Sequence, residues 1–220
     1  MFAELCITSN FTFLTGASHP EEYMERAALM GLSAIAVADV NSVAGIVRAY
    51  SAAREIARQV AELERLEAEG GLIGPPAPLG LPAPPRAPVR NVPRLIPAAR
   101  LVFEEGVEMT ALAASRTGWA LLCRMLSAGR LRSKKGDCRL RLSDLPEVAE
   151  GLAFILHVPL APEGGWRDRV AALVQVHRGR MHLALAPRYD GEDRGRFGLL
   201  TRLAGGFGLA TVATAVPLMH

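Results

Sequence analysis

Apolar runs along this chain alternate with helical patterns. Residues 4–8 read as a first strand, in which Leu5 and Ile7 alternate with Glu4, Cys6 and Thr8. Residues two apart share one face of a strand, so the three side chains at positions 4, 6 and 8 are expected on one side. Residues 33–39 form a fully apolar run with a polar end, which is typical of a strand buried on both faces of a parallel sheet.

Further strands are expected at residues 100–104, 109–115, 151–159, 182–186 and 209–215. Helices are expected at residues 20–30, 44–69, 119–129, 166–176 and 197–203. Alternation of strands and helices indicates βαβ units and an α/β fold. The periodicity does not distinguish a barrel from a doubly wound sheet.

One segment, residues 70–97, breaks this alternation. It contains nine of the fifteen prolines, which remove backbone donors and disfavour helices and central strands. We expect a flexible, polyproline-like surface insertion. The alternative is a docking segment for a proline-reading partner, which is less favoured because no PxxP pattern with consistent flanking charges is present.

The composition favours one globular domain. Of the 220 residues, half are apolar, enough for one sizeable core. The net charge of +3 is too small to indicate nucleic-acid binding by itself. Cys6, Cys123 and Cys138 form no C-x-x-C pair, which favours reduced thiols and a cytoplasmic location. We expect neither a signal peptide nor a membrane span, because the chain lacks both patterns.

A basic stretch follows the third expected helix. Its six cations are Arg130, Arg132, Lys134, Lys135, Arg139 and Arg141. Clustered cations suit phosphate backbones, and such binding falls steeply with salt. No aromatic residues interleave with them, so base stacking is not indicated. Contact with DNA or with another part of a longer chain, and a plain solvated loop, remain equally open.

The stretch from Glu4 to Tyr50 resembles the opening of error-prone DNA polymerases of the bacterial replicative C family. Matches continue in order at residues 100–103, 114–145, 150–156 and 211–220. These polymerases begin with a polymerase-and-histidinol-phosphatase (PHP) domain. The resemblance implies an α/β fold with a distorted seven-stranded (βα) PHP barrel, as a single domain over residues 1–220. It also implies a polymerase core, which would follow residue 220.

Active PHP domains hold two or three metal ions in a cluster of His, Asp, Glu and Cys ligands at the strand ends. Such cations lower the pKa of a bound water for attack on a phosphoester. The resemblance places the corresponding positions on Cys6, Thr8, Asp39, Val40, Arg100, Val216 and Leu218. Few of these side chains can bind a metal, and Arg100 would place a cation where cations must bind. We therefore expect no bound metal and no catalytic residue.

The remaining polar side chains have ordinary structural interpretations. Asp39 is interpreted as a turn residue that bonds nearby N–H groups, and Cys6 as a small buried hydrophobe. His157 could point into the old site, but a core or rim histidine is favoured. Glu4 is hypothesised to pair with Arg100, which would fill the vacated site with an internal salt bridge.

The sequence thus favours a structural PHP domain that braces an error-prone, translesion DNA polymerase. This domain would need no cofactor, whereas magnesium would serve the polymerase core. The expected partners are the remainder of the polymerase chain, DNA indirectly, and a sliding clamp and accessory mutagenesis proteins through the missing regions. The alternatives are a metal-dependent phosphoesterase or 3'–5' proofreading exonuclease, which ligand loss disfavours, and a non-enzymatic interaction module that uses the proline-rich segment.

Overall fold

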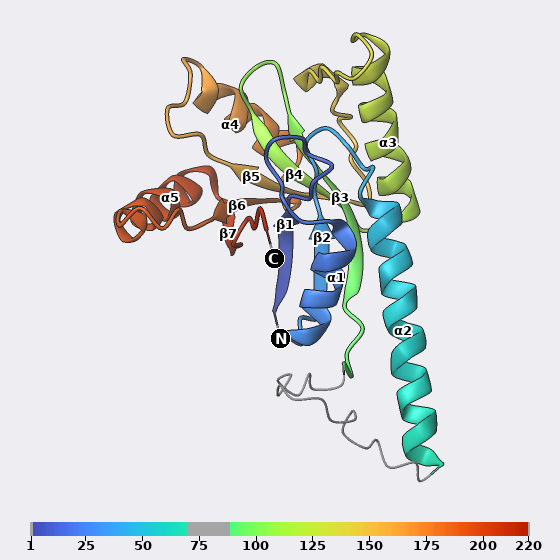
Figure 1. Ribbon diagram of the computed structural model, residues 1–220. Helices are drawn as coiled ribbons and strands as arrows, with labels where there is room; N and C mark the ends of the chain where they lie inside the picture. The colour runs from blue at the N-terminus through green and yellow to red at the C-terminus, as the bar shows by residue number, and fades with distance from the viewer. Residues whose placement is uncertain (1, 70–88, 220) are drawn as a thin grey trace.

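The computed structural model describes residues 2–69 and 89–219. Seven strands form one curled sheet in which each strand pairs with the next along the chain (Figure 1). The strands are β1 (Ala3–Ile7), β2 (Ala34–Val37), β3 (Arg94–Val102), β4 (Glu108–Ala113), β5 (Leu152–His157), β6 (Met181–Leu185) and β7 (Ala210–Ala213). β4 runs antiparallel to both of its neighbours, and the other pairs are parallel. This arrangement confirms the expected barrel-like sheet.

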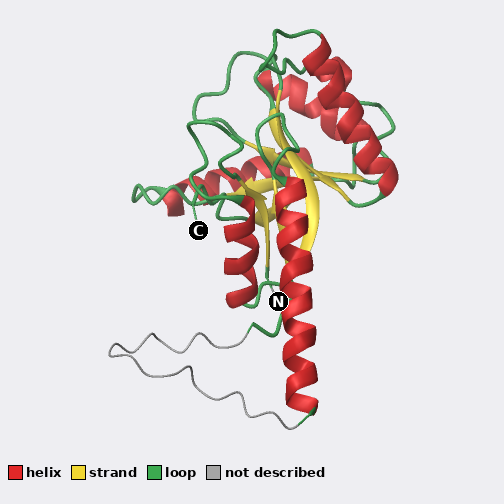
Figure 2. Cartoon of the chain, turned by 45° about the vertical axis from the view of Figure 1, so that its right-hand side comes forward, coloured by secondary structure: helices red, strands yellow, loops and turns green. Residues whose placement is uncertain are grey.

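The helices are α1 (Pro20–Leu29), α2 (Ile46–Ala68), α3 (Arg116–Leu131), α4 (Trp166–Val176) and α5 (Asp193–Phe207). α1 and α2 lie side by side along one flank, and α2 extends well past the sheet (Figures 1 and 2). α3 begins earlier than predicted because the Ser115 hydroxyl accepts a hydrogen bond from the Gly118 amide, at 3.1 Å, as a cap of the first turn. Among the described residues, no helix is long and apolar enough to cross a membrane.

Mostly small side chains form the buried cluster on the inner face of the sheet. The buried cluster there consists of Cys6, Ala36, Ala38, Ala98, Leu112, Ile155 and Ala184. Two larger clusters lie on the helix side of the sheet, one under α1 and α2 and one under the remaining helices. Because alanines occupy little volume, the strands can curl tightly around a narrow interior.

Residues 214–218 bridge the gap between the two edge strands, β7 and β1. The Glu4 carboxylate accepts hydrogen bonds from the Thr214 hydroxyl and, at 2.8 Å, from the Ala215 amide. Farther along, the Thr8 amide donates to the Pro217 carbonyl at 3.1 Å. Side-chain and isolated backbone bonds therefore close the half-barrel where no strand ladder pairs β1 with β7 in the described part of the chain.

The predicted insertion at 70–97 ends too late. β3 begins at Arg94, so the last four residues of that range belong to a central strand, while residues 70–88 lie outside the described residues. Pro97 is tolerated in this strand for a geometric reason. The amides of Arg94 and Arg100 both point towards β2, so alternation turns the Pro97 nitrogen towards β4, and the β3–β4 ladder starts only at Ala98.

Candidate functional site

Asp39 anchors the loop that follows β1. Its buried carboxylate accepts hydrogen bonds from the Ser9 amide at 2.9 Å, the Ser9 hydroxyl at 2.8 Å and the Thr12 hydroxyl at 2.9 Å. Burial raises the pKa of Asp39, and the bonds from Ser9 and Thr12 oppose that rise. Asp39 was interpreted as a turn residue that bonds nearby N–H groups; its carboxylate instead bonds Ser9 and Thr12, which lie 30 and 27 residues away in the sequence.

Cys6 and His157 are buried side chains that both contact the Thr110 hydroxyl. Burial raises the pKa of the Cys6 thiol to about 11, although the Thr110 and Thr214 hydroxyls bond to it. Burial also lowers the pKa of His157 to about 3, with a further contribution from Arg100. The His157 Nε2 atom lies 2.9 Å from the Thr110 hydroxyl. At neutral pH the Cys6 thiol and the His157 imidazole are therefore both uncharged, as expected of the buried side chains predicted from the sequence.

The charged pair at the strand ends differs from the one hypothesised. Arg100 on β3 forms its ion pair with Glu108 on β4. Within the described part of the chain, no ion pair joins Arg100 to Glu4. In the antiparallel ladder Arg100 lies opposite Thr110, so Glu108 is its diagonal neighbour on the same face, whereas the Glu4 carboxylate bonds to residues 214 and 215.

The other positions of the presumed metal site carry no ligand. Thr8 is fully buried, and its hydroxyl has no hydrogen-bond partner among the described residues. Val216 lies beside the interior cluster with a positive φ of 45°, and Leu218 is exposed. Over residues 2–69 and 89–219, no group of three or more His, Cys, Asp or Glu side chains is placed to hold a metal ion. The residues present do not fit a multinuclear metal centre.

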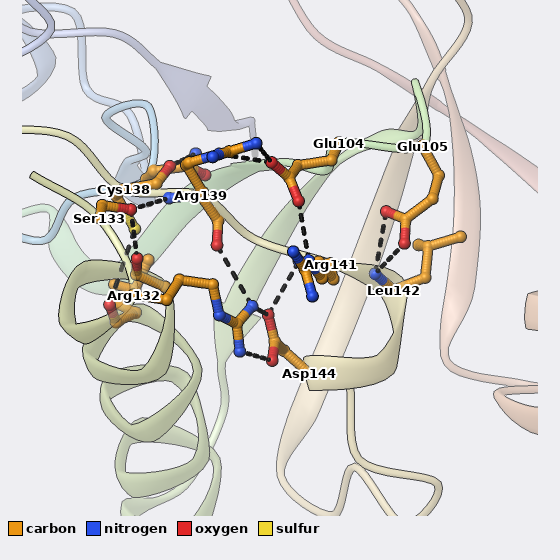
Figure 3. Close-up of polar contacts among 12 residues, drawn as sticks. Glu104, Glu105, Arg132, Ser133, Cys138, Arg139, Arg141, Leu142 and Asp144 are labelled. Carbon is orange, nitrogen blue, oxygen red and sulfur yellow. Dashed lines mark hydrogen bonds and ion pairs between the residues drawn. The ribbon is translucent and has the colours of Figure 1, made fainter.

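Four of the six cations in the basic stretch bond to groups of the chain itself. Three of them, Arg132, Arg139 and Arg141, are shown in Figure 3. Arg132 forms a two-pronged ion pair with Asp144, at 2.5 and 2.6 Å. Arg139 and Arg141 share the Glu104 carboxylate, at 2.5 and 2.8 Å.

These contacts hold the basic stretch, residues 130–141 (the basic loop), against the turn after β3. Arg130 donates to the Asn41 carbonyl at 3.2 Å, and the Glu105 carboxylate accepts from the Leu142 amide at 3.1 Å. The bond from Arg141 lowers the pKa of Glu104, and the bond from Arg132 lowers that of Asp144. Arg130, Lys134 and Lys135 remain as exposed cations of this stretch without an ion pair among the described residues, so the loop offers phosphates less charge than the sequence indicates.

A family model described as "PHP domain" matches residues 4–154. The chain belongs to the PHP domain family. Curated relatives of this PHP domain include the error-prone DNA polymerase of Ruegeria pomeroyi, 41% identical over 230 residues, and that of Sinorhizobium medicae, 38% identical over 222 residues. Each match covers 100% of this chain but only 20% and 17% of the relative. The PHP domain thus spans about a fifth of the length of the polymerases it matches.

Two solved structures share the fold of this PHP domain. One is a putative metal-dependent phosphoesterase from Bifidobacterium adolescentis, with a TM-score of 0.60 and 13% identity over 99% of this chain and 88% of that one. The other is an amidohydrolase from Chromobacterium violaceum, with a TM-score of 0.58 and 14% identity over 100% and 88%. At such low identity the likeness extends to the fold and not to the chemistry.

Sequence reasoning missed several partners at these sites. Ser9 and Thr12 lie far from Asp39 in the sequence, and no local pattern links them to it. Glu108 and Thr110 lie two residues apart on one face of the strand next to Arg100, so they could be predicted as its neighbours once the strand order is known. The apolar pattern does not provide that order.

Proposed function

We propose that this PHP domain is a catalytically silent, structural part of an error-prone DNA polymerase, which it braces during translesion synthesis. The proposal is supported by relatives at up to 41% identity that carry this name and are about five times longer than the matched region. In such a polymerase, nucleotide transfer and its magnesium requirement belong to the rest of the chain. Contacts with DNA, a sliding clamp and accessory mutagenesis proteins belong there as well. The free thiols of Cys6, Cys123 and Cys138 are consistent with a cytoplasmic protein.

The Arg100–Glu108 ion pair is the observation that carries the silent role. In an active centre of this kind the strand ends supply anionic or neutral ligands to cations. Here they supply a guanidinium already neutralised by a carboxylate, beside a His157 imidazole bonded to Thr110. A cation entering this space would meet the positive charge of Arg100 and would have to break the ion pair. The same contacts tie β3, β4 and β5 together at their ends, which suits a rigid bracing element.

Metal analysis combined with activity assays tests this proposal. The dialysed 220-residue chain is analysed for bound metal and assayed for exonuclease and phosphatase activity with manganese and with zinc. We expect no stoichiometric metal and no activity above buffer. Two or more metal ions per chain, with activity that is lost in His157→Gln but kept in His182→Gln, would instead establish the phosphoesterase or exonuclease alternative. His182 is the matched control because it is a half-buried histidine on the neighbouring strand β6.

A further inference from the structure

Five large apolar side chains are exposed on two adjoining segments at the rim of the half-barrel. Phe11, Phe13 and Leu14 belong to the loop after β1, and the exposed fractions of Phe13 and Leu14 are 84% and 91%. Leu218 is the last residue of the segment that bridges the gap between β7 and β1, Met219 follows it, and Met219 is 69% exposed. The Ala17 amide donates to the Leu218 carbonyl at 2.7 Å, so the two segments lie side by side. We call these five residues the apolar rim.

The composition of the two segments resembles the centre of a protein interface. Neither residues 9–18 nor residues 210–219 contain a charged side chain, although charged residues make up 21% of the protein. Scattered exposed apolar residues are ordinary on a protein surface. A cluster that combines two phenylalanines, two leucines and a methionine without any charge is typical of surface that becomes buried against a partner.

The apolar rim is held in place by its own backbone. Asp39 fixes Ser9 and Thr12, and within the loop the Gly16 amide donates to the Thr12 carbonyl at 3.1 Å. Leu14 and Val216 adopt positive φ angles of 60° and 45°, which strain residues that carry a Cβ atom. Strain at non-glycine residues concentrates at functional sites; Leu14 belongs to the apolar rim, and Val216 lies two residues before Leu218.

We propose that the apolar rim is the surface through which this PHP domain docks onto the polymerase part of the same longer chain. The inference rests on the proposed function. About four fifths of each curated relative lie outside the matched region, so a large partner surface is permanently available in those proteins. The complementary surface is apolar and uncharged, because a charged partner group would be desolvated at this rim without a counter-charge. Permanent docking of this kind removes the exposed phenylalanines and leucines from water.

A chimera tests the docking surface. This chain replaces the matched region of the Ruegeria pomeroyi polymerase, and primer extension is measured for the chimera with the native rim and for a Phe13→Ser, Leu14→Asn double variant. Asparagine is chosen because it accepts a positive φ angle more readily than leucine does. Leu131→Ser is the control, since Leu131 is an 88% exposed leucine at the end of α3. The same substitutions in the isolated chain should leave its Tm nearly unchanged or slightly raised, because the substituted side chains bury little surface there.

We expect the rim variant to reduce primer extension by about tenfold or more, and to make the PHP domain easier to release by limited proteolysis, while the control keeps both properties. Full activity and unchanged proteolysis of the rim variant would overturn the docking surface and leave the proposed function intact. A native-rim chimera that contains a folded PHP domain but does not extend primers would count against the proposed function as well.

Discussion

The basic loop and the apolar rim are two surface regions of the same domain, and the structure changes the interpretation of each in the opposite direction. The basic loop concentrates six cations in the sequence, yet three of its arginines form ion pairs with Glu104 and Asp144 within the fold. The apolar rim has no charge in the sequence, yet its phenylalanines and leucines remain exposed while the loop beneath them is bonded to a buried carboxylate. The comparison teaches that a cluster of residues indicates a contact surface only after its internal partners are known.

The strongest test of the comparison removes the anchor under the rim. Asp39→Ala deletes the acceptor of the bonds from Ser9 and Thr12 and leaves buried donors without a partner. We expect the free energy of unfolding to fall by about 3 kcal/mol, measured by urea denaturation. Asp137→Ala, at an exposed aspartate in the basic loop, is the matched control and should change little. A loss below about 1 kcal/mol for Asp39→Ala would show that the loop does not depend on this carboxylate.

A second test uses pH at the strand ends below the rim. Burial holds the pKa of His157 near 3 in the folded state, below its ordinary value of about 6.5. As the pH falls, His157 therefore takes up a proton in the unfolded chain before it does so in the folded chain. The contribution of His157 to stability is complete above about pH 6.5 and is lost as the pH falls towards 3.

The His157 contribution amounts to about 1.4 kcal/mol per pH unit, or roughly 2 kcal/mol between pH 6.5 and pH 5. The difference in unfolding free energy between His157→Gln and the native chain should therefore shift in favour of the variant by that amount over this interval. His182→Gln serves as the control. Parallel pH profiles for the native chain and His157→Gln would contradict the buried, neutral state.

The strain at the rim gives a smaller effect of opposite sign. Leu14→Asn in the isolated chain should raise the free energy of unfolding by about 1 kcal/mol, because asparagine tolerates the positive φ angle and the lost side chain is almost fully exposed. Leu131→Asn has the same change at similar exposure without a positive φ angle and should not stabilise the chain. Thermal denaturation measures the stability of both variants. If Leu14→Asn destabilises the chain, the Leu14 side chain packs within this domain and does not serve a partner.

The smallest effect on stability is expected in the basic loop. Glu104→Gln breaks exposed ion pairs with Arg139 and Arg141, so the Tm should stay within experimental error of the native value. The two freed arginines should instead strengthen retention on immobilised double-stranded DNA at low salt, and this gain should vanish near physiological salt. Glu147→Gln removes the same charge at a carboxylate that forms no ion pair among the described residues. Equal retention of both variants would show that net charge alone governs binding.

Much of the fold follows from the sequence because its signals are local. Alternating apolar runs predicted all seven strands and five helices, and the resemblance to PHP domains predicted how they are arranged. The predicted end of the insertion was wrong, because residues Arg94 to Pro97 belong to β3. Whether a strand accommodates proline depends on which neighbouring strand the proline nitrogen faces. For the site, the sequence shows a hydroxyl at Thr8 and a cation at Arg100, and neither side chain suits a metal ligand.

Only the tertiary structure decided which side chains those residues meet. Arg100 pairs with Glu108 rather than with Glu4 because β3 and β4 are antiparallel neighbours, while residues 214 and 215 bond to Glu4 across the seam. The arginines of the basic loop likewise form ion pairs with Glu104 and Asp144 through tertiary contacts. The sequence by itself determined the elements, because periodicity and residue type are properties of the chain. Partners, burial and exposure were left to the structure, because they arise between segments that lie far apart in the sequence.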